Sequence, residues 1–297
     1  MRILIAGGTG VLGRRIVPLL LGAGHGVTVL ARTPARAAPL AARGARVLQG
    51  DALDRAAVIA AVAQDAPDVI MHQLTDLAAG SSAANARLRI DATRNLADGA
   101  LAAGVERFIV QSIAWCYAPG DRPATEDDPL DTISADPGRR TTVDAVISME
   151  DSARRLGDAV LLRNGILYGP GTWYSPGGQV AAAARAGTLP ADGDVTSFVH
   201  VDDAARAAVA ALGWPAGTVN VVDDEPAAGS AWVPVFCAAV GAPVPSANPG
   251  RPHPWARGAV NARARDLGWT PTFTSWRDGF AAEATVSTRG GRQCMPW

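Results

Sequence analysis

Short apolar segments alternate with helix-like segments through the first half of the chain. Six apolar runs have the composition of buried strands and cover residues 1–6, 26–31, 45–50, 67–74, 107–112 and 159–163. The segments between them suit helices, at 14–21, 35–43, 51–64, 81–103 and 142–156. Such regular alternation predicts an α/β fold built on a doubly wound parallel sheet with right-handed crossovers.

A glycine-rich turn joins the first predicted strand to the first predicted helix. Its sequence, Gly7-Gly8-Thr9-Gly10-Val11-Leu12-Gly13, has the spacing G-x-x-G-x-x-G with Gly8 in addition. In a dinucleotide site the first glycine permits the tight turn, the second leaves room for the pyrophosphate, and the third allows close packing of helix on strand. We assign these roles to Gly7, Gly10 and Gly13. The free N–H groups at the start of the helix would then face the phosphates.

The end of the second strand indicates which dinucleotide is bound. An NAD site usually has an acidic residue here, which holds the ribose 2′-hydroxyl. This chain has Arg32 instead, followed by Arg36, and Arg14 lies just after the glycine turn. Guanidinium groups bind a phosphate through paired hydrogen bonds, whereas a carboxylate repels it. We therefore expect NADP(H); for Arg36, a solvated surface charge is a fair alternative.

The pattern becomes less regular after Tyr168. Helices are predicted at 179–186, 202–212, 231–240 and 261–267, and short strands at 196–199 and 218–222. Residues 117–140 and 241–258 are rich in turn-forming residues and are predicted to be irregular loops. We expect a nucleotide-binding domain over 1–165 and a smaller α/β substrate-binding lobe over 166–297, partly interleaved with the sheet.

Composition narrows the class of protein. The chain has 297 residues, of which 48% are hydrophobic, and lacks an apolar run of transmembrane length. A net charge of −1 gives no indication of binding to nucleic acid or a membrane surface. The sequence starts directly with a strand, so no secretory signal is expected. Cys116, Cys237 and Cys294 lack metal-binding spacing, and we expect reduced thiols, no metal site and a cytoplasmic protein.

Several motifs in order give the chain its resemblance to a known family. They are Gly7–Gly13, Gly50–Asp54, Asp91–Leu96, Arg107–Ser112, Glu126–Leu130, Leu162–Gly171, Phe198–Asp203 and Asp266–Pro271. With these motifs the chain resembles the short-chain dehydrogenase/reductase superfamily, in the extended or atypical branch that includes the NAD-dependent epimerase/dehydratase family. The resemblance covers nearly the whole length. It implies a Rossmann domain that holds a nicotinamide cofactor and a C-terminal lobe that shapes a pocket above it.

The catalytic residues of that superfamily are not all present. Its members normally use a Tyr and a Lys four residues apart on the helix after the long loop, with a Ser or Thr after the fifth strand. All 27 Lys and Arg residues of this chain are arginine, so the pair cannot exist. Counting back from Glu150 puts Thr142 at the tyrosine position and Val146 at the lysine position. Arg89 replaces the family's Asn on the long helix.

Three hypotheses for the function remain open. The first is an NADP(H)-dependent reductase or dehydrogenase acting on a small-molecule carbonyl or hydroxyl, with a rebuilt proton donor. Its catalytic candidates are Ser112, Tyr117 and Thr142. Counting back from Tyr117, however, puts the family's usual hydroxyl position one residue after Ser112. The second is a non-redox lyase, isomerase or cyclase whose base is Asp144, His200 or Glu126. The third is a regulatory protein that binds NADP(H) without turnover.

The remaining expectations concern the cofactor contacts and assembly. The cofactor-binding residues are expected to be Gly7, Thr9, Gly10, Val11, Leu12, Gly13, Arg32, Arg36, Asp51, Ala52, His72, Gln73, Leu74, Ser112 and Asn164. Asp51 follows a strand at the sheet edge where α/β folds bind ligands, so it is placed to reach the adenine. The resemblance also implies a homodimer formed through the helices at 81–103 and 142–156. Trp173 and Tyr174, in a Gly/Pro-rich loop, could cover a substrate.

Overall fold

The chain forms two compact units. The computed structural model describes residues 1–76 and 82–289, so the expectation for Cys294 lies outside the described residues. The first unit comprises 1–118, 129–163 and 205–219, and the second comprises 119–128, 164–204 and the rest from 220. No helix within the described ranges is both long and apolar enough to span a bilayer.

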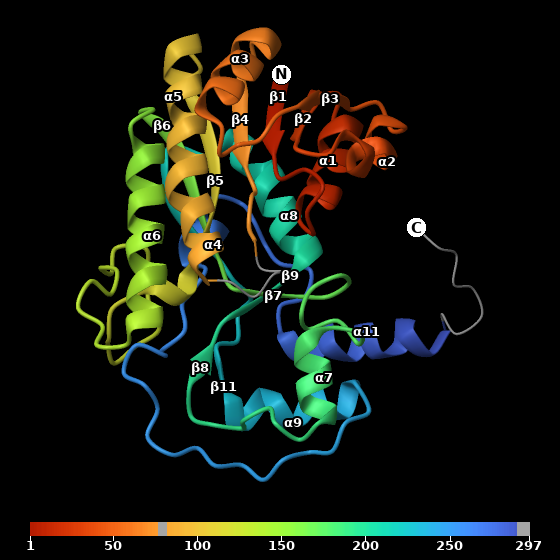
Figure 1. Ribbon diagram of the computed structural model, residues 1–297. Coiled ribbons are helices and arrows are strands. Elements are labelled where there is room, and N and C mark those ends of the chain that lie inside the picture. Colours follow the sequence, from red (N-terminus) through yellow and green to blue (C-terminus); the bar gives the residue numbers. More distant parts are fainter. Residues whose placement is uncertain (77–81, 290–297) are drawn as a thin grey trace. The chain divides into compact units, whose positions relative to one another are not determined.

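A seven-stranded sheet forms the centre of the first unit (Figure 1). In spatial order its strands are β10 (Gly217–Val221), β6 (Asp158–Asn164), β5 (Arg107–Ile113), β4 (Val69–His72), β1 (Arg2–Ala6), β2 (Gly26–Ala31) and β3 (Arg46–Gln49). β1 pairs in parallel with both β2 and β4, and the β2–β3 and β4–β5 pairs are also parallel. The predicted doubly wound sheet is confirmed. The strand order reverses between β1 and β4, which is where such sheets bind ligands.

Helices cover this sheet. They are α1 (Gly13–Gly22), α2 (Ala38–Ala41), α3 (Arg55–Asp65), α4 (Ser82–Arg87), α5 (Thr93–Ala103) and α6 (Pro137–Arg154), and α8 (Val201–Ala210) spans the boundary between the units. α3, α5 and α6 stand side by side (Figure 1). They pack on the sheet through an apolar core that includes Leu4, Ile70, Leu96 and Phe108. Asp54 caps α3 by accepting from the Ala57 N–H at 3.1 Å.

Two helix predictions need correction. The helix expected over 81–103 is interrupted by a π-helical turn at Leu88–Ala92, and residue 81 lies outside the described residues. Its predicted end at Gly104 is confirmed by the left-handed conformation of that residue. α6 begins at Pro137 rather than 142, because Asp136 accepts from the Arg139 N–H at 2.6 Å and caps the helix there. The loop predicted over 117–140 is correspondingly shorter, and α6 ends at Arg154 instead of 156.

The second unit has small sheets, helices and an aromatic core. β7 (Ile166–Tyr168) pairs in parallel with β9 (Phe198–His200), and β8 (Val195–Thr196) pairs antiparallel with β11 (Ala227–Ala228). Its helices include α7 (Gln179–Arg185), α9 (Gly229–Ala239), α10 (Ala262–Asp266) and α11 (Trp276–Arg289), and α11 was not predicted. Tyr168, Phe198, Trp232, Phe236, Trp276 and Phe280 are among the buried residues of this core.

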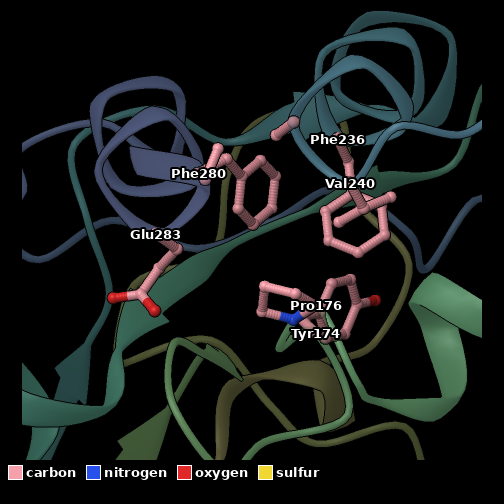
Figure 2. Close-up of a pocket in the computed structure, with 8 residues that line it drawn as sticks. Tyr174, Pro176, Phe236, Val240, Phe280 and Glu283 are labelled. Atoms are coloured by element: carbon pink, nitrogen blue, oxygen red, sulfur yellow. The ribbon is translucent and has the colours of Figure 1, made fainter. Parts of the chain in front are cut away.

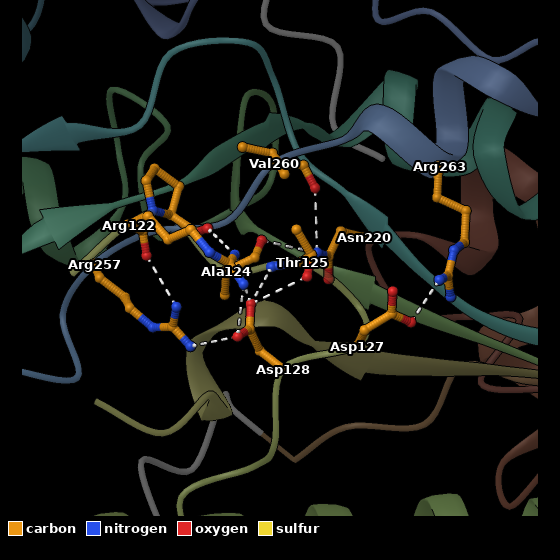
Figure 3. Close-up of polar contacts among 10 residues, drawn as sticks. Arg122, Ala124, Thr125, Asp127, Asp128, Asn220, Arg257, Val260 and Arg263 are labelled. Atoms are coloured by element: carbon orange, nitrogen blue, oxygen red, sulfur yellow. Dashed lines mark hydrogen bonds and ion pairs between the residues drawn. The ribbon is translucent and has the colours of Figure 1, made fainter. Parts of the chain in front are cut away.

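Polar contacts fix residues 119–128 within the second unit (Figure 3). Asp128 accepts from the Thr125 N–H at 2.7 Å and forms a two-point ion pair with Arg122 at 2.9 and 3.1 Å. The Asn220 amide donates to the Val260 carbonyl at 3.1 Å. Because three separated stretches of chain meet here, the segment is held by tertiary contacts and not by regular secondary structure.

Candidate active site

The glycine turn has the geometry that a dinucleotide cradle requires. Gly7 has φ +94°, and a Cβ there would lie 2.5 Å from the Gln73 backbone. A Cβ on Gly13 would lie 2.3 Å from the Gly7 carbonyl oxygen, so a side chain cannot fit at either position. At Gly10 the Gly7 oxygen, at 3.2 Å, is the one atom within 4 Å among the described residues. The Gly10 position therefore borders open space, which fits an approaching pyrophosphate.

The start of α1 supplies positive potential to this cradle. α1 begins at Gly13, directly after the turn, and its N-terminal end has no side-chain cap and no acidic residue in the first turn. The first N–H groups of a helix lack partners within the helix, and the dipole adds partial positive charge there. The turn and the helix start therefore fit the phosphates of a dinucleotide.

Three arginines lie just after β2 and at the start of α1. Arg14, Arg32 and Arg36 are exposed, and within the described parts of the chain none of their guanidinium groups has a hydrogen-bonding or ion-pairing partner. Asp51, after β3, accepts from the Leu53 N–H at 3.0 Å. The carbonyl of the adjacent Ala52 accepts from the Asn95 amide at 2.9 Å, which ties this loop to α5. The predicted NADP contacts at these residues remain predictions.

The exit of β4 is built from groups that are fixed and neutral. His72 Nδ1 accepts from the Leu74 N–H at 3.1 Å, so Nε2 carries the proton and donates to Thr93 Oγ1 at 2.8 Å. Burial, with a smaller effect from Arg89, lowers the pKa of His72 to about 4. The Gln73 N–H donates to the Ala6 carbonyl at 2.8 Å, while its side-chain amide nitrogen is buried without a partner in the described structure. His72 therefore orders this loop and is uncharged at neutral pH.

Ser112 belongs to a buried ionic network. Its hydroxyl donates to Glu150 Oε1 at 2.7 Å. Arg163 donates to the same carboxylate from Nε at 2.9 Å and from Nη2 at 2.8 Å. Tyr117 is buried, with its ring 4.9 Å from the Arg163 guanidinium carbon. The structure thus brings Ser112 and Tyr117 to one cluster, through an arginine–glutamate pair that the sequence analysis did not foresee.

The positions predicted for the family's tyrosine and lysine carry no acid or base. Thr142 Oγ1 donates back to the Gly138 carbonyl at 3.1 Å within α6. Val146 is fully buried in the apolar core. Ile113 follows Ser112 on β5 and faces the opposite side of the sheet. If the family's hydroxyl position is the residue after Ser112, that position is Ile113 and has no hydroxyl group.

The alternative bases lie in different environments. Asp144 is exposed on α6. His200 Nδ1 accepts from the Asp202 N–H at 3.2 Å, and Nε2 lies 3.3 Å from Glu283. Glu126 accepts from the Asn220 N–H at 2.7 Å. His200 and Glu126 thus have structural contacts, His200 at the β9–α8 junction and Glu126 with the backbone of β10.

Asn164 is the last residue of β6 and belongs to the second unit. It is buried, and its side-chain oxygen has no hydrogen-bond partner in the described structure. An unsatisfied buried amide of this kind fits a residue that awaits a ligand, and its predicted cofactor role remains a prediction.

An apolar pocket lies inside the second unit. Figure 2 shows the side chains of Tyr174, Phe236 and Phe280 converging on it, with the Glu283 carboxylate at its edge. Phe280 stacks nearly parallel to Tyr174, at 5° between ring planes and 6.4 Å between centroids. Burial raises the pKa of the Tyr174 hydroxyl, so it stays protonated. Tyr174 is a candidate from its sequence context, whereas Phe280 and Glu283 are not, because α11 was not predicted.

Comparison with known proteins identifies the family. The model of the NAD dependent epimerase/dehydratase family matches residues 3–222, so the chain belongs to this family. The chain is accordingly an oxidoreductase or an epimerase/dehydratase-like enzyme of a pyridine-nucleotide-dependent family. One curated relative, a 3-diazoavenalumate denitrifying reductase from a Streptomyces species, is 43% identical over 308 residues, covering 95% of this chain and all of the relative.

Solved structures show the same fold. The UDP-glucose 4-epimerase of Thermotoga maritima, with UDP-glucose, has a TM-score of 0.77 at 22% identity, covering 97% of this chain and 99% of that one. The dTDP-glucose 4,6-dehydratase DesIV of Streptomyces venezuelae, with NAD and TYD bound, has a TM-score of 0.78 at 23% identity, covering 98% of both chains. At this identity the likeness establishes the fold.

Proposed function

We propose that this protein is an NADPH-dependent reductase that replaces the diazo group of a small organic acid with hydrogen and releases N2. The full-length relative supports both the reductase class and the diazo substrate class. The observation that carries the proposal is the missing proton-transfer pair, with Thr142 and Val146 in its place and no lysine in the chain.

Diazo reduction explains why such a pair can be absent. Reduction of a carbonyl requires a hydride at carbon and a proton at oxygen, so a general acid is needed. When bound, the reduced nicotinamide would supply a hydride to the diazonium form of this group, in which the hydride electron pair forms the new C–H bond and the C–N bonding pair leaves with N2. This displacement balances without a proton from the protein. The chain then needs only to bind, orient and desolvate the reactants.

The residues around the site suit that task. The glycine turn and the start of α1 would hold the pyrophosphate, and the β4 exit is fixed by His72. His72 is neutral and the Cys116 thiol has a pKa raised to about 12 by burial. Neither the His72 imidazole nor the Cys116 thiol is therefore a charged nucleophile that could attack a reactive diazo group.

The preference for NADPH over NADH is part of this proposal. The guanidinium groups of Arg14, Arg32 and Arg36 have no partners among the described residues, and we expect them to contact the 2′-phosphate. A phosphate on the ribose would give them the paired charged hydrogen bonds that guanidinium groups form well.

The experiment compares two matched substrates. The purified protein is incubated with NADPH and either carboxybenzenediazonium or carboxybenzaldehyde, and nicotinamide oxidation and N2 are measured against a protein-free control. We expect enzyme-dependent N2 release matched by NADPH oxidation with the diazonium compound alone. NADPH deuterated at the transferring position should place deuterium on the ring carbon. Reduction of the aldehyde without reduction of the diazonium compound would refute the proposal.

A further inference from the structure

The guanidinium group of Arg89 is buried and has no counter-charge among the described residues. Arg89 is 7% exposed and lies in the π-helical turn Leu88–Ala92 between α4 and α5. Across the described residues its side chain forms no hydrogen bond or ion pair. Single π-helical turns within α-helices are frequent at functional sites, because they change the direction of side chains locally.

Arg89 has two ionisable neighbours that carry no charge at neutral pH. Its ionisable neighbours in the first unit include His72 and Cys116, and both are uncharged at neutral pH because burial shifts their pKa values away from neutrality. Burial also lowers the pKa of Arg89, and the neighbour that opposes this is the Cys116 thiol. An uncompensated buried charge is among the most unfavourable groups in a folded protein. Such a residue is consistent with an anion that arrives with the ligand.

The location of Arg89 points to the substrate end of the site. The π-helical turn packs against α6, the helix that carries Thr142 and Val146. Its neighbour His72 ends β4 and Cys116 follows β5. The glycine turn follows β1, and Arg32 and Arg36 follow β2. Arg89 is therefore on the far side of the cradle from the 2′-phosphate position.

We infer that Arg89 binds the carboxylate of the substrate and so orients it for hydride transfer. A carboxylate matches the fork of guanidinium donors and neutralises the buried charge, whereas the hydroxyls of a nicotinamide ribose would leave the charge uncompensated. The identity of the acid as a diazo compound rests on the proposed function, but the anion site does not. Arg89 is then a positioning and specificity residue in the place of the family's asparagine.

The test measures binding, separately from turnover. Dissociation constants of cinnamate, its neutral amide cinnamamide, and NADPH are determined for the native protein, Arg89→Met and Arg87→Met. Arg87 is an exposed arginine two residues earlier, 3.6 Å from Asp91, and is the matched control. We expect Arg89→Met to weaken cinnamate binding about 10- to 100-fold, as for other hydrogen bonds to charged groups, and to leave cinnamamide and NADPH unchanged. Arg87→Met should match the native protein.

Thermal unfolding of the ligand-free proteins gives a second measurement. Removal of an unpaired buried charge should raise the Tm of Arg89→Met above that of the native protein, whereas loss of a structural contact would lower it. A lowered Tm, an equal loss of NADPH affinity, or a native protein without preference for cinnamate over cinnamamide would each overturn the inference. If diazo reduction fails but cinnamate binding depends on Arg89, the proposed function fails and this site stands.

Discussion

Glutamate 150 offers a direct test of the buried network behind the candidate site. Its side chain is fully buried and binds Ser112 and Arg163, with Arg154 at 2.8 Å as a further partner. Glu150→Gln keeps the shape but removes the charge, and this leaves the Arg163 guanidinium, 5% exposed, without its counter-ion. Breaking a buried ion pair from one side costs about 3–5 kcal/mol, because the remaining charge stays buried. We expect a loss of stability of that size at pH 7.

The assay is urea unfolding followed by circular dichroism. Asp151→Asn is the matched control, because Asp151 is 66% exposed and its pair with Arg154 at 3.2 Å should contribute about 0–1 kcal/mol. Burial raises the pKa of Glu150, but hydrogen bonding and charge from Arg163 outweigh it, so the net pKa is lowered. The contribution of Glu150 is therefore present above about pH 4.3, the unfolded value, and is lost as pH falls through the folded pKa. A loss at pH 7 no larger than that of Asp151→Asn would refute the reasoning.

Four further predictions test the cofactor, the chemistry, a buried acid and the assembly. The native protein should bind NADPH more tightly than NADH by about 1.5–3 kcal/mol, and Arg32→Asp should remove the difference in titrations; equal native affinities would contradict this. Tyr117→Phe should keep turnover within about threefold if no proton donor is needed, whereas a loss of about 10²-fold or more would restore Tyr117 as general acid. Burial raises the pKa of Asp223 to about 8, so the native Tm should fall as pH rises from about 4 to 8; Asp223→Asn should flatten this profile, and parallel profiles would exclude the effect. Light scattering at micromolar concentration should show twice the 30.5 kDa chain mass if α5 and α6 form the predicted dimer interface, and a monomer would exclude it.

The first strands and the glycine turn could be predicted from the sequence, because the patterns that indicate them extend over only a few residues. The strand of residues 26–31 and the glycine roles follow from apolar runs and spacing within a few residues, and the structure reproduces that strand. α11 was missed because irregular structure precedes it and its large apolar anchors are few, chiefly Trp276 and Phe280. The hydrogen bond from Ser112 to Glu150 could not be predicted from the sequence either, because the two residues lie 38 positions apart. Likewise, periodicity over 81–103 does not distinguish a continuous α-helix from one with a π-helical turn.

The π-helical turn at Leu88–Ala92 also bears on how this protein can change over evolutionary time. Each residue of an α-helix turns the chain by about 100°, so loss of one codon within this turn would rotate α4 by that amount relative to α5. Such a deletion would restore a regular helix and change the direction of Arg89 without altering any residue of the sheet or the glycine turn. Gain and loss of one residue at this point thus offer a short mutational route between relatives that keep the nucleotide site and differ in the charge of the molecules they accept.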